Sequence, residues 1–370
     1  MKSENPFLTV GYDGPETFCD RVRETEELLS AIHNGRNVTL IAPRRYGKTG
    51  LIHHVMHSLP PDYDKVYLDI YATKDLSDFV KGFARAVVSA LETTSEKVAS
   101  ALGRFFASLR PTITPQSDGS IKWSFDLIPS MAKTSLEETF DYLRKRERPV
   151  VIAIDEFQQV RNYPEYSVEA LLRSFIQFIP NVRFIFAGSQ LHLMSDMFVS
   201  PRGPFYNSTD ILSLEVIRKE AYRDFAAAFF NKAEKAFSAV AFDKLYERFD
   251  GITWYVQSVL NRVWERTNGL ETPDDVESAI HLLVESRRLV FLDLLRSQTE
   301  AQQAVLKAMA TDGVVTAPTG KDFIARHLLG AASTVASVVE ALIEKELLYR
   351  TEKGFVVYDR LFGEWLKGRD

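Results

Sequence analysis

The 370-residue sequence is poor in cysteine, has no long apolar run and carries no excess of positive charge. Its one cysteine, Cys19, excludes an internal disulfide and favours a reducing compartment. No apolar stretch is long enough to cross a bilayer, and the opening residues, MKSENPFLTVGYDG, lack the apolar segment of a signal peptide. These absences predict a cytoplasmic protein that does not enter a membrane.

The charge balance bears on the binding partners of the protein, and its length bears on the number of domains. The formal net charge of −5 gives no general attraction to nucleic acid or to an anionic membrane, so such contacts would need a local basic patch. Apolar residues make up 45% and charged residues 26% of the chain, as is usual for globular proteins. A chain of this length exceeds one ordinary core, and we expect two or three domains.

The stretch IAPRRYGKTG, residues 41–50, indicates a phosphate-binding loop between a strand expected at 38–42 and a helix expected at 48–59. It meets the pattern G-x-x-x-x-G-K-[ST], except that Ala42 replaces the first glycine. Lys48 would contact the β- and γ-phosphates, Thr49 would bind Mg²⁺, and backbone N–H groups at the helix start would face the phosphates. The nucleotide-binding residues expected in this loop are Ala42, Pro43, Arg44, Arg45, Tyr46, Gly47, Lys48, Thr49 and Gly50.

An acidic pair follows a second apolar strand, expected at 149–154. Asp155 and Glu156 would come at its carboxyl end, where open parallel sheets bind their ligands. Adjacent buried carboxylates are unfavourable unless a cation or a water network uses them. We therefore expect Asp155 to hold Mg²⁺ through water, and Glu156 to act as the general base on the attacking water.

A third strand, expected at 182–187, ends in Gly188-Ser189-Gln190. A polar residue at this end could touch the γ-phosphate or the attacking water, so Ser189 joins Lys48 and Glu156 as a catalytic candidate, with Gln190 beside it. The alternative is a capped turn into the helix that follows.

Strand and helix patterns alternate through the first 217 residues, which predicts a parallel sheet covered on both faces. The segment 111–129 breaks this alternation with two short runs joined by Ser-Asp-Gly, and we expect a surface hairpin there. The remaining strands are expected at 65–71 and 211–217, and the remaining helices at 75–92, 97–109, 133–147 and 167–179.

Two further regions follow the sheet. Apolar stripes at helical spacing predict a helical lid at 218–298. Three short helical patterns and a strand-turn-strand around Lys353-Gly354 predict a winged helix-turn-helix at 299–370. The expected domains are therefore 1–217, 218–298 and 299–370.

The chain resembles the archaeal and bacterial P-loop ATPases of the STAND type, relatives of AAA+ proteins. The resemblance rests on Pro43–Thr49 and Ile154–Phe157, and more weakly on Phe18–Arg21, Glu26–Leu28, Gly188-Ser189 and Val357–Trp365. It implies an α/β P-loop domain of the ASCE or AAA+ kind, with strand 182–187 lying between the loop strand and the Asp-Glu strand. It also implies that Asp20 and Arg21 lie near the adenine, and that the protein switches between ADP-bound closed and ATP-bound open forms.

Two departures from the family pattern bear on hydrolysis more than on binding. The segment Pro204-Phe-Tyr-Asn-Ser208 lacks the arginine that the family often has at its end, and Arg202 lies nearby. Gly251-Ile-Thr253 stands where the family often has Gly-x-Pro, which bears on a lid contact to adenine.

Other signals leave alternatives open. Arg44 and Arg45 could reach a phosphate or a neighbouring subunit, or could be solvated. His53, His54 and His57 lack the spacing and the carboxylate of a metal site, and we interpret them as ordinary helix residues.

The winged-helix region has nine Lys and Arg against ten Asp and Glu, a net charge of −1. Neutralised phosphates supply most of the affinity for DNA, so a protein partner or an autoinhibitory contact is favoured over DNA. The leading hypothesis is an Mg²⁺- and ATP-dependent regulatory ATPase that works as a switch, either alone or as an oligomer. The alternatives are a nucleotide-gated DNA-binding protein with little turnover, and a site that keeps ADP as a structural cofactor.

Overall fold

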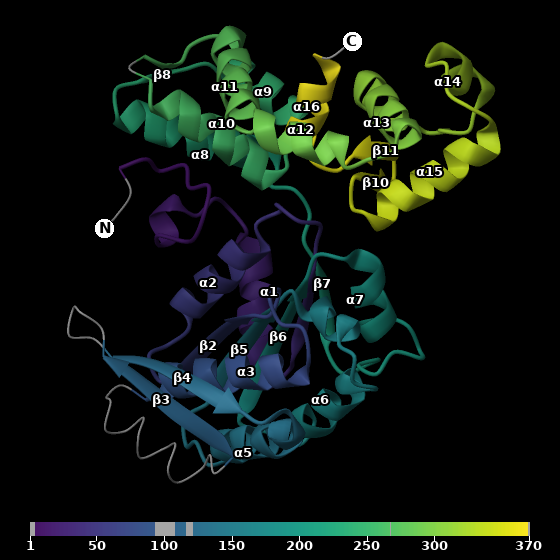
Figure 1. Cartoon of the computed structure of the whole chain (residues 1–370). Helices are drawn as coiled ribbons and strands as arrows, with labels where there is room; N and C mark the ends of the chain where they lie inside the picture. The colour runs from purple at the N-terminus through teal and green to yellow at the C-terminus, as the bar shows by residue number, and fades with distance from the viewer. Residues whose placement is uncertain (1–3, 93–107, 116–120, 267, 369–370) are drawn as a thin grey trace. The chain divides into compact units, whose positions relative to one another are not determined.

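A five-stranded parallel sheet organises the first part of the chain, in the order β2-β5-β6-β1-β7 (Figure 1). The computed structural model describes residues 4–92, 108–115, 121–266 and 268–368. β6 pairs with both β1 and β5, so the strand order expected from the family resemblance is confirmed. The strands are β1 (Val38–Ile41), β2 (Asp64–Asp69), β5 (Val150–Asp155), β6 (Val182–Gly188) and β7 (Asp210–Ser213).

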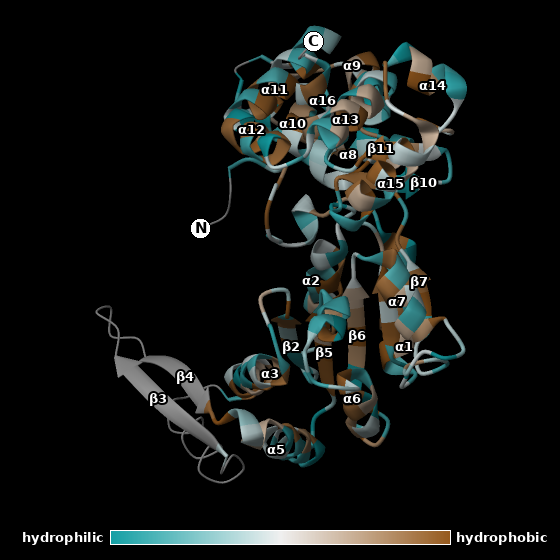
Figure 2. Ribbon diagram, turned by 45° about the vertical axis from the view of Figure 1, so that its right-hand side comes forward, coloured by the Kyte–Doolittle hydropathy of each residue, from teal (hydrophilic) through white to brown (hydrophobic). Residues whose placement is uncertain are grey.

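Helices cover both faces of the sheet, and the apolar residues of its strands lie between them (Figure 2). In β5, Val150, Ile152 and Ile154 pack into the core under α3, α5 and α6, whereas Val151 and Ala153 pack into the core under α1 and α2. This burial on two faces explains why the strands are continuous apolar runs. The helices are α1 (Val22–His33), α2 (Lys48–Ser58), α3 (Leu76–Leu91), α5 (Ala132–Arg144), α6 (Val168–Ile176) and α7 (Leu191–Phe198).

In and around the five-stranded sheet, the structure differs from the expected elements in two places. The last strand, expected at 211–217, ends at Ser213. Its neighbour β1 ends at Ile41, whose carbonyl accepts from the N–H of Leu214, and β1 has no later residue with which the strand could pair. Of the helix expected at 97–109, residues 97–107 lie outside the described residues, Ser108 lies in a bend, and Leu109 begins a strand instead. The expected hairpin is present, as antiparallel β3 (Leu109–Pro115) and β4 (Ile121–Leu127).

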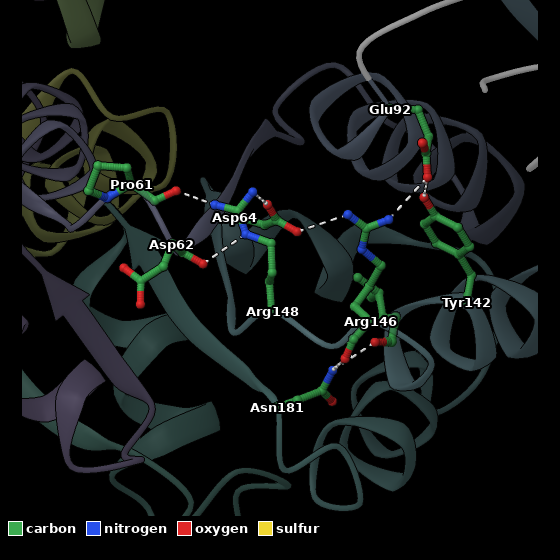
Figure 3. A network of polar contacts seen from close by, with 9 residues as sticks. Pro61, Asp62, Asp64, Glu92, Tyr142, Arg146, Arg148 and Asn181 are labelled. Atoms are coloured by element: carbon green, nitrogen blue, oxygen red, sulfur yellow. Dashed lines mark hydrogen bonds and ion pairs between the residues drawn. The ribbon is translucent and has the colours of Figure 1, made fainter. Parts of the chain in front are cut away.

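A polar network around Arg146 holds the amino ends of the strands together (Figure 3). The guanidinium donates to Asp64 at the start of β2 and to Glu92 after α3, each at 3.1 Å. Asn181, just before β6, donates to the carbonyl of Arg146 at 3.1 Å, and Arg148 pairs with Asp64 at 3.4 Å. The network fixes three strand starts at the edge opposite the strands' carboxyl ends.

The described chain divides into two compact units, one of residues 10–217 and one of residues 218–368 together with 4–9. The second unit begins with five helices, and the expected division into a lid and a winged-helix domain remains a prediction. Within the described residues, none of the helices combines the length and apolar character needed to cross a bilayer. The five helices are α8 (Lys219–Lys232), α9 (Ala239–Arg248), α10 (Thr253–Trp264), α11 (Pro273–Ser286) and α12 (Arg288–Arg296).

The sequence pattern predicted that this region is helical throughout, but the structure contains a short pair of strands within it. Ala236–Phe237 (β8) pairs in parallel with Gly269–Leu270 (β9). Gly269 has φ 91°, and a Cβ there would lie 2.5 Å from the carbonyl of Ala236, so this pairing requires glycine. Strands of two residues have no readable period, which is why the sequence did not reveal them.

The last elements form the expected winged helix-turn-helix, and its closing helix is tied to the helical region. Asp359 caps α16, and its carboxylate accepts a hydrogen bond from the Tyr255 hydroxyl at 3.3 Å. Arg360 pairs with Asp250 at 2.6 Å. The elements are α13 (Glu300–Asp312), α14 (Lys321–Arg326), α15 (Ala332–Glu344), β10 (Leu348–Thr351), β11 (Gly354–Val357) and α16 (Arg360–Lys367).

Residues 4–9 pack into the second unit through one aromatic side chain. Phe7 is fully buried, with its ring centroid 5.4 Å from that of Phe230 and 5.7 Å from that of Trp264. Asn261 donates to the carbonyl of Phe7 at 2.7 Å, and Trp254 donates to the carbonyl of Thr9 at 3.1 Å. Within residues 4–368, the described chain therefore passes between the two units after Thr9 and again after Ile217.

Replacing Phe7 by alanine should lower the free energy of unfolding of the second unit by about 3–5 kcal/mol, because a buried aromatic ring leaves a cavity. Urea unfolding followed by tryptophan emission reports mainly on this unit, since Trp254, Trp264 and Trp365 belong to it and only the fourth tryptophan, Trp123, belongs to the first unit. Val10→Ala is the control, because Val10 is 87% exposed. Equal unfolding midpoints for the two variants would show that Phe7 does not anchor the segment.

Candidate functional site

The loop between β1 and α2 has the backbone of an anion-binding turn. Arg45 and Gly47 take left-handed φ values of 75° and 93°, and α2 begins at Lys48 without a side-chain cap. The first N–H groups of a helix have no partner within it, and its dipole favours negative charge there. The loop therefore offers a phosphate several backbone donors in front of a helix N-terminus.

Lys48 lies within the electrostatic reach of the acidic pair. Its side chain is only 5% exposed. Burial lowers the pKa of Lys48, and the nearby carboxylates of Glu156 and Asp155 oppose this by favouring the charged ammonium. The lysine of the loop and the acids that follow β5 thus belong to one site.

A direct hydrogen bond joins the two halves of this site. The Thr49 hydroxyl donates to Asp155 Oδ2 at 2.6 Å. Asp155 is 2% exposed, and its Oδ1 accepts from the backbone N–H of Glu156 at 3.0 Å. The hydroxyl and the carboxylate are oxygen donors that Mg²⁺ prefers, and a set this small suits an ion that keeps waters and binds phosphates. The residues present therefore fit Mg²⁺.

Glu156 is held beside the end of β6. Its Oε2 accepts from the Ser189 hydroxyl at 2.7 Å and from Gln158 Nε2 at 2.5 Å. Glu156 takes a left-handed φ of 55°, which is costly for a residue with a side chain and persists where the surroundings hold it. Gln190 is the N-cap of α7, one residue beyond Ser189.

Arg21 supports the loop. Its buried guanidinium donates to the Tyr46 carbonyl at 3.1 Å and to Glu24 at 2.9 Å. Asp20 and Arg21 take left-handed φ values of 54° and 67°, which turn the chain into α1. Their place near an adenine remains a prediction.

The other residues singled out in the sequence have local contacts. Arg44 lies over the Tyr71 ring at 5.9 Å. The ring of His54 stacks on that of Phe18 at 4.1 Å, and the ring of His53 lies 4.5 Å from that of Tyr67. Across the described residues, no group of three or more His, Cys, Asp and Glu side chains is arranged to hold a metal.

The segment that departs from the family pattern has a core residue. Phe205 is fully buried, with its ring 4.9 Å from that of Phe198, whereas Arg202 is exposed. This segment therefore packs an aromatic side chain into the core, and the described structure gives it no arginine at its end.

Tyr67 and Gln158 also contact the acidic pair, although no sequence motif indicated them. The Tyr67 hydroxyl donates to Asp155 Oδ2 at 3.1 Å, and burial together with the charge of Asp155 raises the pKa of this tyrosine. Gln158 contacts Glu156 and Ser189. Tyr67 lies two residues before the end of β2, the one sign that could have placed it near the ligand edge.

The fold and the site define a class: a P-loop type ATPase domain followed, in the same chain, by a winged helix. Residues 18–259 match the profile of a family described as an ATPase domain predominantly from Archaea. The chain belongs to this family of ATP-binding ATPases. Residues 289–368 match a probable winged helix domain. The search of curated proteins gave no significant match.

Solved structures share the fold along nearly the whole chain. A Walker-type ATPase of Pyrococcus abyssi is 16% identical with a TM-score of 0.66, covering 98% of this chain and 99% of its own. The ORC2 protein of Aeropyrum pernix, solved as ADPNP and ADP complexes, is 14% identical with a TM-score of 0.59, covering 99% and 97%. The ORC1 protein of the same organism, solved in complex with DNA, is 15% identical with a TM-score of 0.53, covering 100% and 98%.

The single thiol near the loop gives a test of this region's packing. Cys19 is 5% exposed, and burial, with the charge of Asp20, raises its pKa. A raised pKa lowers the thiolate fraction at pH 8, so alkylation by iodoacetamide should be at least ~100-fold slower in native than in denatured protein. Intact mass against time measures both rates. Similar rates in the two states would contradict the buried placement.

Proposed function

We propose that this protein binds ATP with Mg²⁺, hydrolyses it to ADP and phosphate, and uses its nucleotide state as a conformational switch. The observation that carries the proposal is the hydrogen bond between Thr49 and Asp155. It joins a loop after β1 to the end of β5, two strands that are not neighbours in the sheet.

Each residue has a chemical task in this proposal. Lys48 and the first N–H groups of α2 hold the phosphates, and the left-handed loop residues aim those groups. Thr49 and Asp155 hold Mg²⁺, which when bound neutralises phosphate charge. Glu156 accepts a proton from the attacking water, and Ser189 lies beside it.

The finer class follows from the residues that resemble STAND-type ATPases. Pro43–Thr49 and Ile154–Phe157 carry the nucleotide site, and Val357–Trp365 includes the helix α16 tied to Asp250. We infer that nucleotide exchange in the first unit is transmitted to the second through the two chain crossings, in the cytoplasm. The winged helix then contacts a protein partner or inhibits its own ATPase domain.

The same proposal implies slow turnover by the single chain. Pro204–Ser208 has no arginine at its end, and Arg202 is exposed. An arginine that stabilises the charge of the transferred phosphoryl group can raise turnover by 10³–10⁵. We infer that any such arginine comes from the loop, as Arg44 or Arg45, or from a neighbouring subunit.

Lys48→Ala should weaken binding of a fluorescent ATP analogue at least ~100-fold, because a buried charge beside the phosphates is lost. Fluorescence titration measures the dissociation constant. Lys133→Ala is the matched control, since Lys133 is an exposed lysine of the same unit. Wild-type affinity in the Lys48 variant would overturn the assignment of the loop.

Glu156→Gln should keep ATP affinity within about twofold and lower turnover by about 10²–10⁴, the usual contribution of a general base. Phosphate release under saturating ATP measures this. If wild-type protein releases no phosphate over hours and purifies with ADP, the site holds ADP as a structural cofactor and the hydrolysis proposal fails.

A DNA-binding function is the second candidate, favoured by the winged helix and by a similar fold solved in complex with DNA. The lack of basic side chains along the helix that would enter a DNA groove argues against this function. Residues 328–339, which enter and form most of α15, contain no charged side chain. Arg350 near the wing lies over the Phe355 ring at 5.6 Å.

A mobility-shift series over salt concentration separates the two candidates. Few phosphate contacts predict no shift at physiological salt and no change on Arg350→Ala. Tight binding with a steep salt dependence, weakened by Arg350→Ala and Lys353→Ala, would instead establish the DNA-binding function.

A further inference from the structure

Gln158 has a buried side-chain amide that has no part in the proposed binding of phosphate or Mg²⁺. Its side chain is 3% exposed and stands in the short turn Phe157–Asn162 that follows β5. Its neighbours in this turn fill the core, since Phe157 and Val160 are buried apolar residues. A glutamine at such a place keeps two donors and an acceptor that must find partners.

The partners of this amide all belong to the candidate site. Gln158 Nε2 donates to Glu156 Oε2 at 2.5 Å and to the Ser189 hydroxyl at 3.4 Å. Gln158 Oε1 accepts from the backbone N–H of Ser189 at 3.3 Å. One side chain therefore connects the proposed base after β5 with the residue that directly follows β6.

The end of β6 leaves room for this amide. A Cβ added to Gly188 would lie 2.5 Å from Gln158 Oε1 and 2.4 Å from Met194 Sδ. Gly188 has an ordinary φ, so space rather than backbone conformation requires glycine there. The Ser189 hydroxyl donates to the same Glu156 oxygen at 2.7 Å, which closes a three-residue network.

We propose that Gln158 is a positioning residue that fixes the carboxylate of Glu156 and couples it to the end of β6. The inference rests on the proposed function, in which Glu156 is the general base. A hydrogen bond to an ionised acceptor is stronger than one to a neutral acceptor. The amide of Gln158 therefore stabilises the charged carboxylate of Glu156 more than its neutral form. Loss of the amide removes one of the two side-chain donors that hold Glu156 Oε2 among the described residues, the other being Ser189, so the carboxylate is held less tightly.

The test compares two adjacent glutamines. Gln158→Met keeps the side-chain length and removes the amide, and it should lower kcat by about 10- to 100-fold with KM and ATP-analogue affinity within twofold. Gln159→Met is the matched control, because Gln159 donates to the Thr73 carbonyl at 2.8 Å, away from Glu156. Gln158→Asn, which keeps an amide but is shorter, should also lower kcat and serves if the methionine variant does not fold. Wild-type kcat in Gln158→Met would overturn the inference.

A double-mutant cycle with Glu156→Gln separates positioning from a general structural effect. If Gln158 acts through Glu156, then Gln158→Met should cause no further loss of turnover in the Glu156→Gln background. Additive losses would mean that Gln158 acts elsewhere.

A second cycle, on urea unfolding of the nucleotide-free protein, does not depend on turnover. The contact exists without nucleotide, so the effects of Gln158→Met and Glu156→Ala on the free energy of unfolding should not add; alanine is used here because glutamine would keep an oxygen that accepts from Gln158. Additive unfolding effects would overturn the contact itself. If Glu156→Gln turns over ATP like wild type, the proposed function fails, while the unfolding cycle still decides whether Gln158 holds Glu156.

Discussion

The contact between the Thr49 hydroxyl and the Asp155 carboxylate is the constraint on which the site depends. Thr49 is an exposed residue in the first turn of α2, a helix whose other face is buried, and Asp155 lies at the end of a fully buried strand. With Lys48 buried beside them, one cation and the carboxylate of Asp155 lie together where water has little access, next to the half-buried Glu156. Charges in such surroundings are favourable only when they are paired or bind a ligand. The arrangement is therefore suited to a charged nucleotide and its metal.

A second set of polar residues orients the acids. Asp155 accepts from Tyr67 of β2, and Glu156 accepts from Ser189 at the end of β6 and from Gln158 in the turn after β5. Each acid thus accepts a hydrogen bond from a residue of a neighbouring strand or its end. A shift of β6 relative to β5 would therefore move the Ser189 hydroxyl and change the orientation of the Glu156 carboxylate. The network around Arg146 fixes the opposite ends of β2 and β5, which limits movement there.

The second unit combines the helical region and the winged helix. Arg360 pairs with Asp250, and Arg248 pairs with Glu364, so α16 is fixed to the turn between α9 and α10. That turn contains Gly251, where the sequence departs from the family pattern. The closing segment Val357–Trp365, first noted as a resemblance, thus has a physical role in joining the winged helix to the helices before it. Phe7 adds the chain's N-terminal segment to the same unit.

The sequence by itself determined the class of fold and pointed to the two halves of the candidate site. Apolar periodicity and order are local properties, so the parallel sheet, the hairpin, the winged helix and the residues Lys48, Thr49, Asp155 and Glu156 could be predicted from it. Tertiary structure alone decided which side chains complete the site. Tyr67 and Gln158 lie in segments with no motif, and the positions of β8 and β9 depend on pairing over more than 30 residues. A hydrogen bond between distant segments leaves no periodic trace in a single sequence, because it depends on the packing of the sheet that brings the segments together.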